Sequence, residues 1–101
     1  MYAMTGKLMV QAGKRAELVD ILKRAASLVG RLPACSLYIV SEDLANENRV
    51  WVFEMWTDKE AHDASLTDER VRSLIAEAMP LMDGAPSGAE LRVAGGHRIG
   101  G

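Results

Sequence analysis

The chain has 101 residues and a mass of 11.0 kDa, enough for one domain and too short for two. Apolar residues make up 49% and charged residues 26%, which are ordinary proportions for a globular protein. The formal net charge of −2 leaves no basic excess to neutralise phosphates, which argues against nucleic-acid binding. Because no apolar run approaches the ~20 residues that span a bilayer and residues 1–10 lack signal-peptide features, we expect a cytoplasmic protein without a membrane partner.

The sequence carries few residues for metal or cofactor chemistry. Cys35 is the single cysteine, so no disulfide can form within the chain. One cysteine and two widely separated histidines, His62 and His97, do not make a zinc pattern. There is no Gly-rich phosphate loop and no C-x-x-C motif. We therefore expect neither a metal nor a cofactor.

The first half of the chain predicts a strand, a helix and a hairpin. Residues 2–10 alternate in polarity as a strand does, and residues 14–29 repeat apolar positions at helical spacing before Gly30 and Pro33. Residues 35–42 and 49–56 read as two strands joined by a polar loop over residues 43–48. The strand over residues 49–56 is apolar on both faces, so we expect helices to cover one face and a second copy of the chain to cover the other.

The second half predicts two helices and a last strand. The T-x-x-E sequence from Thr57 to Glu60 fits a capping box that opens a short helix through residue 66. A second helix begins near residue 68, and Pro80 should kink or end it. A strand over residues 89–94 completes a domain of residues 1–94, and residues 95–101 read as a flexible tail.

This order of elements, β-α-β-β-α-β, is that of the ferredoxin-like α+β fold. In that fold, the helices lie on one face of a four-stranded antiparallel sheet. The uncovered face, expected to be apolar, is where two sheets could meet in a homodimer with twofold symmetry.

Two stretches resemble a known family. The sequence Glu54-Met-Trp56 ends the third strand, and the helix that follows begins Asp58-Lys-Glu-Ala-His-Asp-Ala-Ser-Leu66. Together with the element order, they resemble the antibiotic biosynthesis monooxygenase superfamily, in particular its quinol monooxygenase branch. The resemblance implies a dimeric α/β-barrel that oxygenates phenolic, polyketide or quinol-like substrates without flavin, haem or metal, with the substrate reducing dioxygen.

The chain also departs from the family pattern. Many members carry a histidine nine residues after the tryptophan of E-x-W; this chain has Ser65 there and His62 three residues earlier. Haem-degrading members use an asparagine on the first strand and a histidine late in the second helix. Residues 2–10 contain no asparagine and residues 69–82 no histidine, so we do not expect a haem protein.

His62 is our candidate catalytic base. A histidine has an ordinary pKa of about 6.5, which suits removal of a proton from a phenol or hydroquinone at neutral pH. The deprotonated ring is richer in electrons and donates one to dioxygen more readily. The structural alternative is a histidine on the helix surface or in its cap.

Five further residues are candidates for substrate binding. Trp56 could stack on a flat ring or pack in the core. Glu54, a carboxylate on an apolar face, needs a partner such as Arg72 or Arg92, and a structural salt bridge is the alternative to a functional role. The other three offer hydroxyl groups or an adaptable apolar lining: Tyr38, Ser65 and Met79.

Three functions are consistent with these residues. The first is a cofactor-independent monooxygenase that oxidises a quinol, phenol or polyketide-like aromatic. The second is a dimeric module without enzymatic activity that binds a small aromatic molecule or acts in a stress response. The third is an isomerase or other proton-transfer enzyme, which would need a base and no oxygen.

Overall fold

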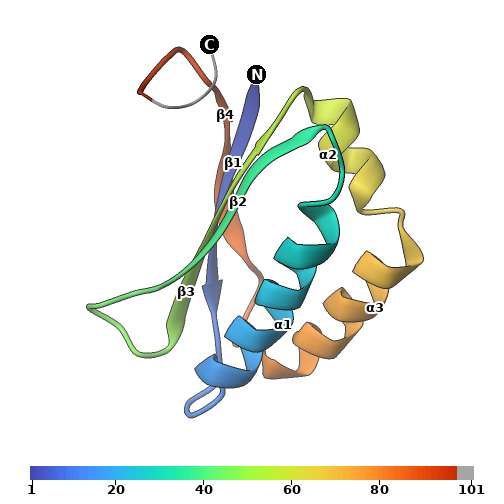
Figure 1. Cartoon of the computed structure of the whole chain (residues 1–101). Helices are drawn as coiled ribbons and strands as arrows, with labels where there is room; N and C mark the ends of the chain where they lie inside the picture. Colours follow the sequence, from blue (N-terminus) through green and yellow to red (C-terminus); the bar gives the residue numbers. More distant parts are fainter. Residues whose placement is uncertain (98–101) are drawn as a thin grey trace.

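The computed structural model describes residues 1–97 as a four-stranded antiparallel sheet with three helices packed on one face (Figure 1). The elements follow in chain order: β1 (Tyr2–Met9), α1 (Arg15–Val29), β2 (Cys35–Glu42), β3 (Arg49–Trp56), α2 (Lys59–Ser65), α3 (Glu69–Ala78), a 3₁₀ turn (Met79–Leu81) and β4 (Ser87–Arg92). The strands lie in the order β2-β3-β1-β4. The predicted ferredoxin-like α+β arrangement is confirmed.

Most boundaries lie within a residue or two of those expected from the sequence. The N-cap of α2 is Asp58 rather than Thr57, because the Asp58 carboxylate accepts a hydrogen bond from the Ala61 amide at 2.8 Å. Asp68 caps α3 in the same way, and α3 ends before Pro80 as predicted. The predicted 57–66 helix therefore begins later than expected, at Lys59.

The last strand differs most from the prediction, since it occupies Ser87–Arg92 rather than residues 89–94. Its first residues are small and carry no alternating hydrophobic signal. Gly88 pairs with Gly6 of β1, and a Cβ at residue 88 would collide with the Thr5 carbonyl oxygen. Close approach of the two backbones thus explains the glycine and the earlier start of the strand.

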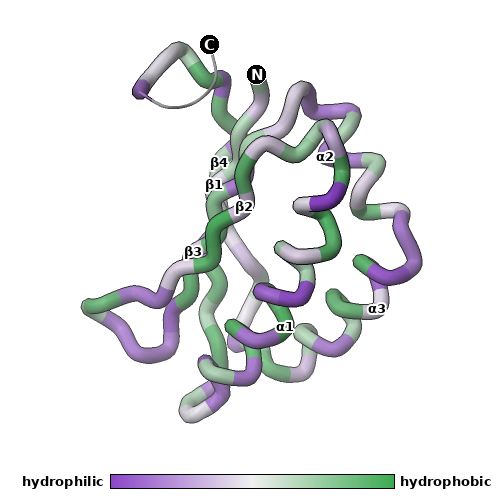
Figure 2. Tube along the Cα trace, viewed as in Figure 1, coloured by the Kyte–Doolittle hydropathy of each residue, from purple (hydrophilic) through white to green (hydrophobic). Residues whose placement is uncertain are grey.

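The core lies between the sheet and the helices and has two parts. Near one end of the sheet, Val10, Leu18 and Val50 form a fully buried cluster. Near the other end, Trp56, with no exposed surface, packs with Tyr2 and the helices. Hydrophobic residues mark the strands and the inner helix turns, whereas the β2–β3 loop is largely hydrophilic (Figure 2).

The opposite face of the sheet carries a row of apolar side chains and is uncovered by any described helix. One row across all four strands consists of Leu37, Met55, Ala3 and Leu91. Large side chains on this face remain exposed: Ile39 by 45%, Trp51 by 38% and Leu91 by 43%. The sequence of the third strand predicted two apolar faces, and the helices cover only one of them.

Two further expectations from the sequence concern the C-terminal tail and membrane-spanning helices. Residues 98–101 of the predicted tail lie outside the described residues. Within residues 1–97, no helix is both long and apolar enough to cross a membrane.

The Leu18→Ala variant should lower the free energy of unfolding by about 2–5 kcal/mol, because Leu18 is fully buried between α1 and the sheet and its truncation leaves a cavity. Urea denaturation measures the change. The matched control is Leu44→Ala in the β2–β3 loop, where the leucine is fully exposed and the expected change is within about 0.5 kcal/mol. Equal losses in the two variants would contradict this description of the core.

Candidate functional site

A cavity of about 290 Å³ lies between the sheet and the helices α1 and α3. Both helices supply apolar walls at the spacing that gave each helix its hydrophobic stripe. The α1 wall consists of Ile21, Leu22, Ala25 and Val29, and the α3 wall of Val71, Leu74, Ile75 and Ala78. Such an apolar hollow with few polar groups is typical of sites for small organic molecules.

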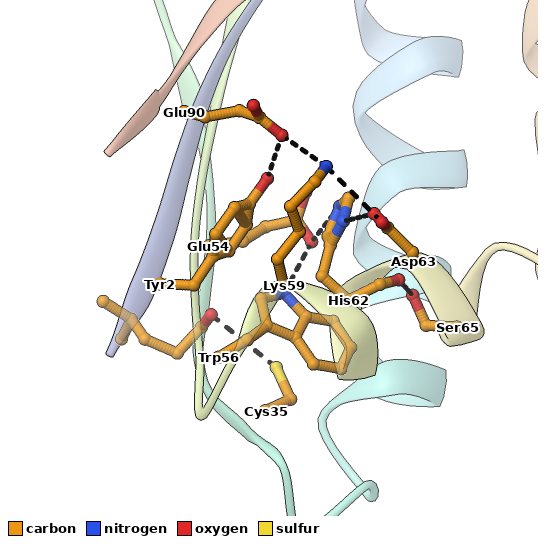
Figure 3. A network of polar contacts seen from close by, with 10 residues as sticks. Tyr2, Cys35, Glu54, Trp56, Lys59, His62, Asp63, Ser65 and Glu90 are labelled. Atoms are coloured by element: carbon orange, nitrogen blue, oxygen red, sulfur yellow. Dashed lines mark hydrogen bonds and ion pairs between the residues drawn. The ribbon is translucent and has the colours of Figure 1, made fainter. Parts of the chain in front are cut away.

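Only three of the lining side chains that the structure describes are polar: Tyr38, Glu54 and Ser65. Met79 also lines the cavity, near its edge, and is 62% exposed. Four of the six predicted site residues thus surround one space. Trp56 and His62 do not line it; both lie next to the Glu54 carboxylate (Figure 3).

Glu54 is the central polar group of this site. It lies on β3, one of the two middle strands, with Tyr38 and Met4 opposite it on the neighbouring strands. Its residue surface is only 7% exposed. Burial raises the pKa of the Glu54 carboxyl, while the Trp56 hydrogen bond and the nearby His62 oppose that shift. Because burial is the largest of these effects, the Glu54 carboxyl takes up and releases a proton at a pH closer to neutral than an exposed glutamate does.

The two carboxylate oxygens of Glu54 have different surroundings. The Trp56 indole donates a hydrogen bond to Oε1 at 3.1 Å, and His62 Nε2 lies 3.9 Å from the same oxygen. Oε2 accepts no hydrogen bond from the described residues. Among the described residues, every fully buried polar side-chain atom has a hydrogen-bond partner. Since Oε2 has no partner, it cannot be fully buried and must be accessible, and Glu54 is one of the residues that line the cavity. The arrangement leaves one oxygen free to contact a molecule in the cavity.

The expectation that Arg72 or Arg92 pairs with Glu54 is therefore wrong, since Trp56 and His62 contact the Glu54 carboxylate instead. The tryptophan follows Glu54 at i+2 on the same face of β3, where both side chains point toward the helices. Its N–H offsets part of the cost of burying the acid.

His62 is held on α2 between two carboxylates. Its Nδ1 lies 3.0 Å from Asp63 Oδ1, and its ring packs against Tyr2 and edge-on against Trp56. The imidazole is 6% exposed, whereas the Asp63 side chain is 51% exposed. The hydrogen bond from His62 lowers the pKa of Asp63, so this carboxyl stays ionised near neutral pH. His62 therefore connects the buried acid to a surface acid.

Sequence reasoning missed the charged residues around His62. Lys59 bridges Asp63 at 3.4 Å and Glu90 at 2.7 Å, and the Tyr2 hydroxyl donates to Glu90 at 3.1 Å (Figure 3). Asp63 was recognisable only as the neighbour of His62. Tyr2 and Glu90 come from opposite ends of the chain, so only the pairing of β1 with β4 brings them to this place.

The two hydroxyl groups of the site differ in what they offer. Ser65 lines the cavity and donates its hydrogen to the His62 carbonyl oxygen at 2.6 Å, so its hydroxyl oxygen can serve a ligand only as an acceptor. Burial raises the pKa of Tyr38, which therefore keeps its proton and can act as a donor. Within residues 1–97, no group of three or more His, Cys, Asp or Glu side chains is arranged to hold a metal ion.

Comparison with protein families identifies the family to which this fold belongs. The family model described as antibiotic biosynthesis monooxygenase matches residues 1–77. The chain belongs to this family. The match includes all of the strands and helices that carry Tyr38, Glu54, Trp56 and His62. No curated protein is similar enough to count as a match.

Solved structures agree with the family assignment. A candidate antibiotic biosynthesis monooxygenase from Chloroflexus aurantiacus J-10-fl is 35% identical, with a TM-score of 0.87 and 98% of each chain covered. SnoaB from Streptomyces nogalater, described as a cofactor-independent oxygenase, is 14% identical over 96% of each chain, with a TM-score of 0.82. Rv0793 from Mycobacterium tuberculosis is 16% identical, with a TM-score of 0.84 and coverage of 95% of this chain and 97% of that chain. The latter two show a shared fold.

The Glu54→Gln variant should be more stable than the wild type at pH 8 and should lose this advantage at pH 4. Because burial raises the pKa of Glu54, the folded protein holds a proton that the unfolded chain has already released, so wild-type stability falls as pH rises through that window. The neutral amide avoids this loss and keeps an oxygen for the Trp56 N–H. We expect a gain on the order of 1 kcal/mol at pH 8.

Urea denaturation at both pH values measures this difference. Glu60→Gln, which makes the same charge change at an exposed position of α2, is the control and should show no such pH dependence. A gain for Glu54→Gln that is equal at pH 4 and pH 8 would contradict the raised pKa.

Proposed function

We propose that the protein is a cofactor-independent monooxygenase that oxidises a quinol, phenol or polyketide-like aromatic molecule with dioxygen. The observation that carries the proposal is that Glu54, whose Oε2 atom accepts no hydrogen bond from the described residues, lines a cavity that is otherwise almost entirely apolar. A carboxylate in such surroundings is a stronger base than one in water, because desolvation disfavours its charged form. Membership of the monooxygenase family supports the same reaction class.

In the proposed reaction, Glu54 takes the proton from a substrate hydroxyl group. The resulting anion gives an electron to dioxygen, and the two radicals combine to form a carbon–oxygen bond. For a hydroquinone, one dioxygen then yields a hydroxyquinone and one water. The substrate supplies all the electrons that dioxygen accepts, so the reaction needs no external reductant.

The remaining site residues have supporting roles in this proposal. Trp56 holds the carboxylate through its N–H, and His62, our candidate base from the sequence, acts on the substrate through Glu54 because its Nε2 faces that acid. Tyr38 and Ser65 would orient the substrate oxygens. Met79 would cover the ring at the open edge of the cavity.

The cavity also indicates the class of substrate. Its volume is about 290 Å³, roughly twice the size of a 150 Å³ cavity that binds benzene, which suits one or two rings. None of the described lining side chains is Lys or Arg, so a carboxylated substrate would find only the Glu54 carboxylate and no cation. We therefore propose uncharged phenols or hydroquinones as substrates.

Oxygen uptake with a matched set of hydroquinones, with and without a carboxyl substituent, tests this function. The wild type should consume oxygen with the uncharged compounds and much less with the carboxylated ones. Glu54→Gln should lower kcat by about 100-fold or more, because a positioned base contributes about that much. Glu60→Gln is the control on the surface of α2 and should retain the wild-type rate.

Three outcomes would overturn parts of the proposal. Equal rates for the wild type and Glu54→Gln would remove the proposed base. Turnover that continues without oxygen would instead indicate an isomerase or another proton-transfer enzyme. Thermal stabilisation by the compounds without any turnover would indicate a binding module.

We also propose that the uncovered face of the sheet joins two copies of the chain. The row of Leu37, Met55, Ala3 and Leu91 is continuous across four strands, and such an apolar face suits a second identical sheet.

Light scattering at micromolar concentration should therefore give twice the chain mass of 11.0 kDa. The double variant Ile39→Arg/Leu91→Arg places charges on the exposed part of this face and should give a monomer. Leu32→Arg, in the turn after α1, is the control and should remain dimeric. A monomeric wild type would contradict the proposal.

A further inference from the structure

Glu54 has two routes to water, one through the cavity and one through His62. The cavity route starts at the free Oε2 atom. The second route starts at Oε1, continues to His62 Nε2 at 3.9 Å, and leaves from Nδ1 to the half-exposed Asp63 at 3.0 Å (Figure 3). An apolar ligand that fills the cavity closes the first route and leaves the second open.

The hydrogen bonds of His62 define which ring nitrogen carries the proton. Asp63 is ionised and accepts only, so Nδ1 carries the hydrogen of the neutral ring. Nε2 then has a free lone pair that faces Glu54. The separation of 3.9 Å is about 1 Å longer than a hydrogen bond, so direct proton transfer requires the carboxyl group and the imidazole to approach by that much.

Neighbouring groups keep this geometry in place. The imidazole ring lies 5.4 Å from the Tyr2 ring and 5.7 Å from the Trp56 ring, which restricts its rotation. Lys59 pairs with Asp63 and Glu90 and so holds the surface acid beside the ring. The remaining titratable groups around Glu54 are Tyr38 and Cys35 on β2, neither of which contacts His62 through a hydrogen bond.

We propose that His62 and Asp63 form a proton path between Glu54 and solvent that works while a ligand seals the cavity. His62 transfers the proton, and Asp63 is a positioning residue that keeps Nε2 free to accept it. The inference deepens the proposed function, on which its kinetic test rests.

The proton steps of this path balance over one reaction. Glu54 takes the substrate proton through Oε2 and passes a proton from its carboxyl group to His62 Nε2, while the Nδ1 proton leaves through Asp63 to water. The ring now carries its hydrogen on Nε2. When the reduced oxygen needs a proton, Nε2 returns one through Glu54, and Nδ1 takes one from water, which restores the starting state.

The first test reads the position of the hydrogen on His62 without any turnover. Long-range ¹H–¹⁵N spectra of the labelled protein distinguish the two neutral forms, and the His97→Gln variant assigns the signals because the chain has two histidines. In the neutral imidazole of the wild type, the hydrogen should be on Nδ1. In Asp63→Ala it should move mainly to Nε2, whereas Glu60→Gln should leave it unchanged. A wild-type hydrogen on Nε2, or no change in Asp63→Ala, overturns the role of Asp63.

The second test uses an uncharged hydroquinone that the wild type oxidises. His62→Gln should lower kcat by about 100-fold and Asp63→Ala by roughly tenfold, with KM changing by less than about twofold, because proton transfer and not binding is affected. Asp63 is half exposed, so its variant should fold even if His62→Gln does not.

If Asp63→Ala has the same kcat as the wild type at every pH from 5 to 9, the proposed proton path is overturned. A higher KM together with a lower kcat in both variants would indicate a structural role for the two residues and would also overturn the proton path. If the wild type oxidises none of the compounds, the proposed function fails, and the spectra alone then decide whether His62 connects Glu54 to Asp63.

Discussion

The buried carboxylate of Glu54 is the constraint around which the rest of the site is arranged. An acid on the apolar face of a middle strand costs free energy, and the site offsets only part of that cost through the Trp56 N–H and the nearby imidazole. A fully compensated acid would be a structural ion pair with little chemical use. Glu54 instead keeps one oxygen free and a raised pKa, both of which suit a group that exchanges protons with a bound molecule.

The fold supports this arrangement through the division between sheet and helices. Glu54 and Trp56 lie on β3, which β1 and β2 pair with on either side, and α2 places His62 next to them. The cavity remains because α1 and α3 present apolar walls on the other side of the acid. The same side chains that make the core of a small domain thus also make the surroundings that change the chemistry of one carboxyl group.

Much of this architecture could be predicted from the sequence, because the strands and helices carry clear periodic patterns. The weak point was β4, whose first residues are small and give no hydrophobic signal. The site was harder to predict. Glu54 was visible as an acid on an apolar face, but its partners were not, since Trp56 was expected to stack on a substrate or pack in the core and His62 was expected to act on the substrate directly. Contacts such as Tyr2 with Glu90 depend on strand pairing between distant segments, which no local pattern reveals.

The position of Glu54 on a strand paired on both sides has a consequence for how such a site can diversify. The acid cannot move without breaking two ladders, so its place is the same for any guest molecule. The wall opposite it comes from α3 and the turn that follows, where Ile75 and Met79 are partly open to water. Substitutions along that wall would change the shape of the cavity while the position of the Glu54 carboxylate stays the same. Proteins that evolve from one such fold could therefore accept new compounds with the same reactive group.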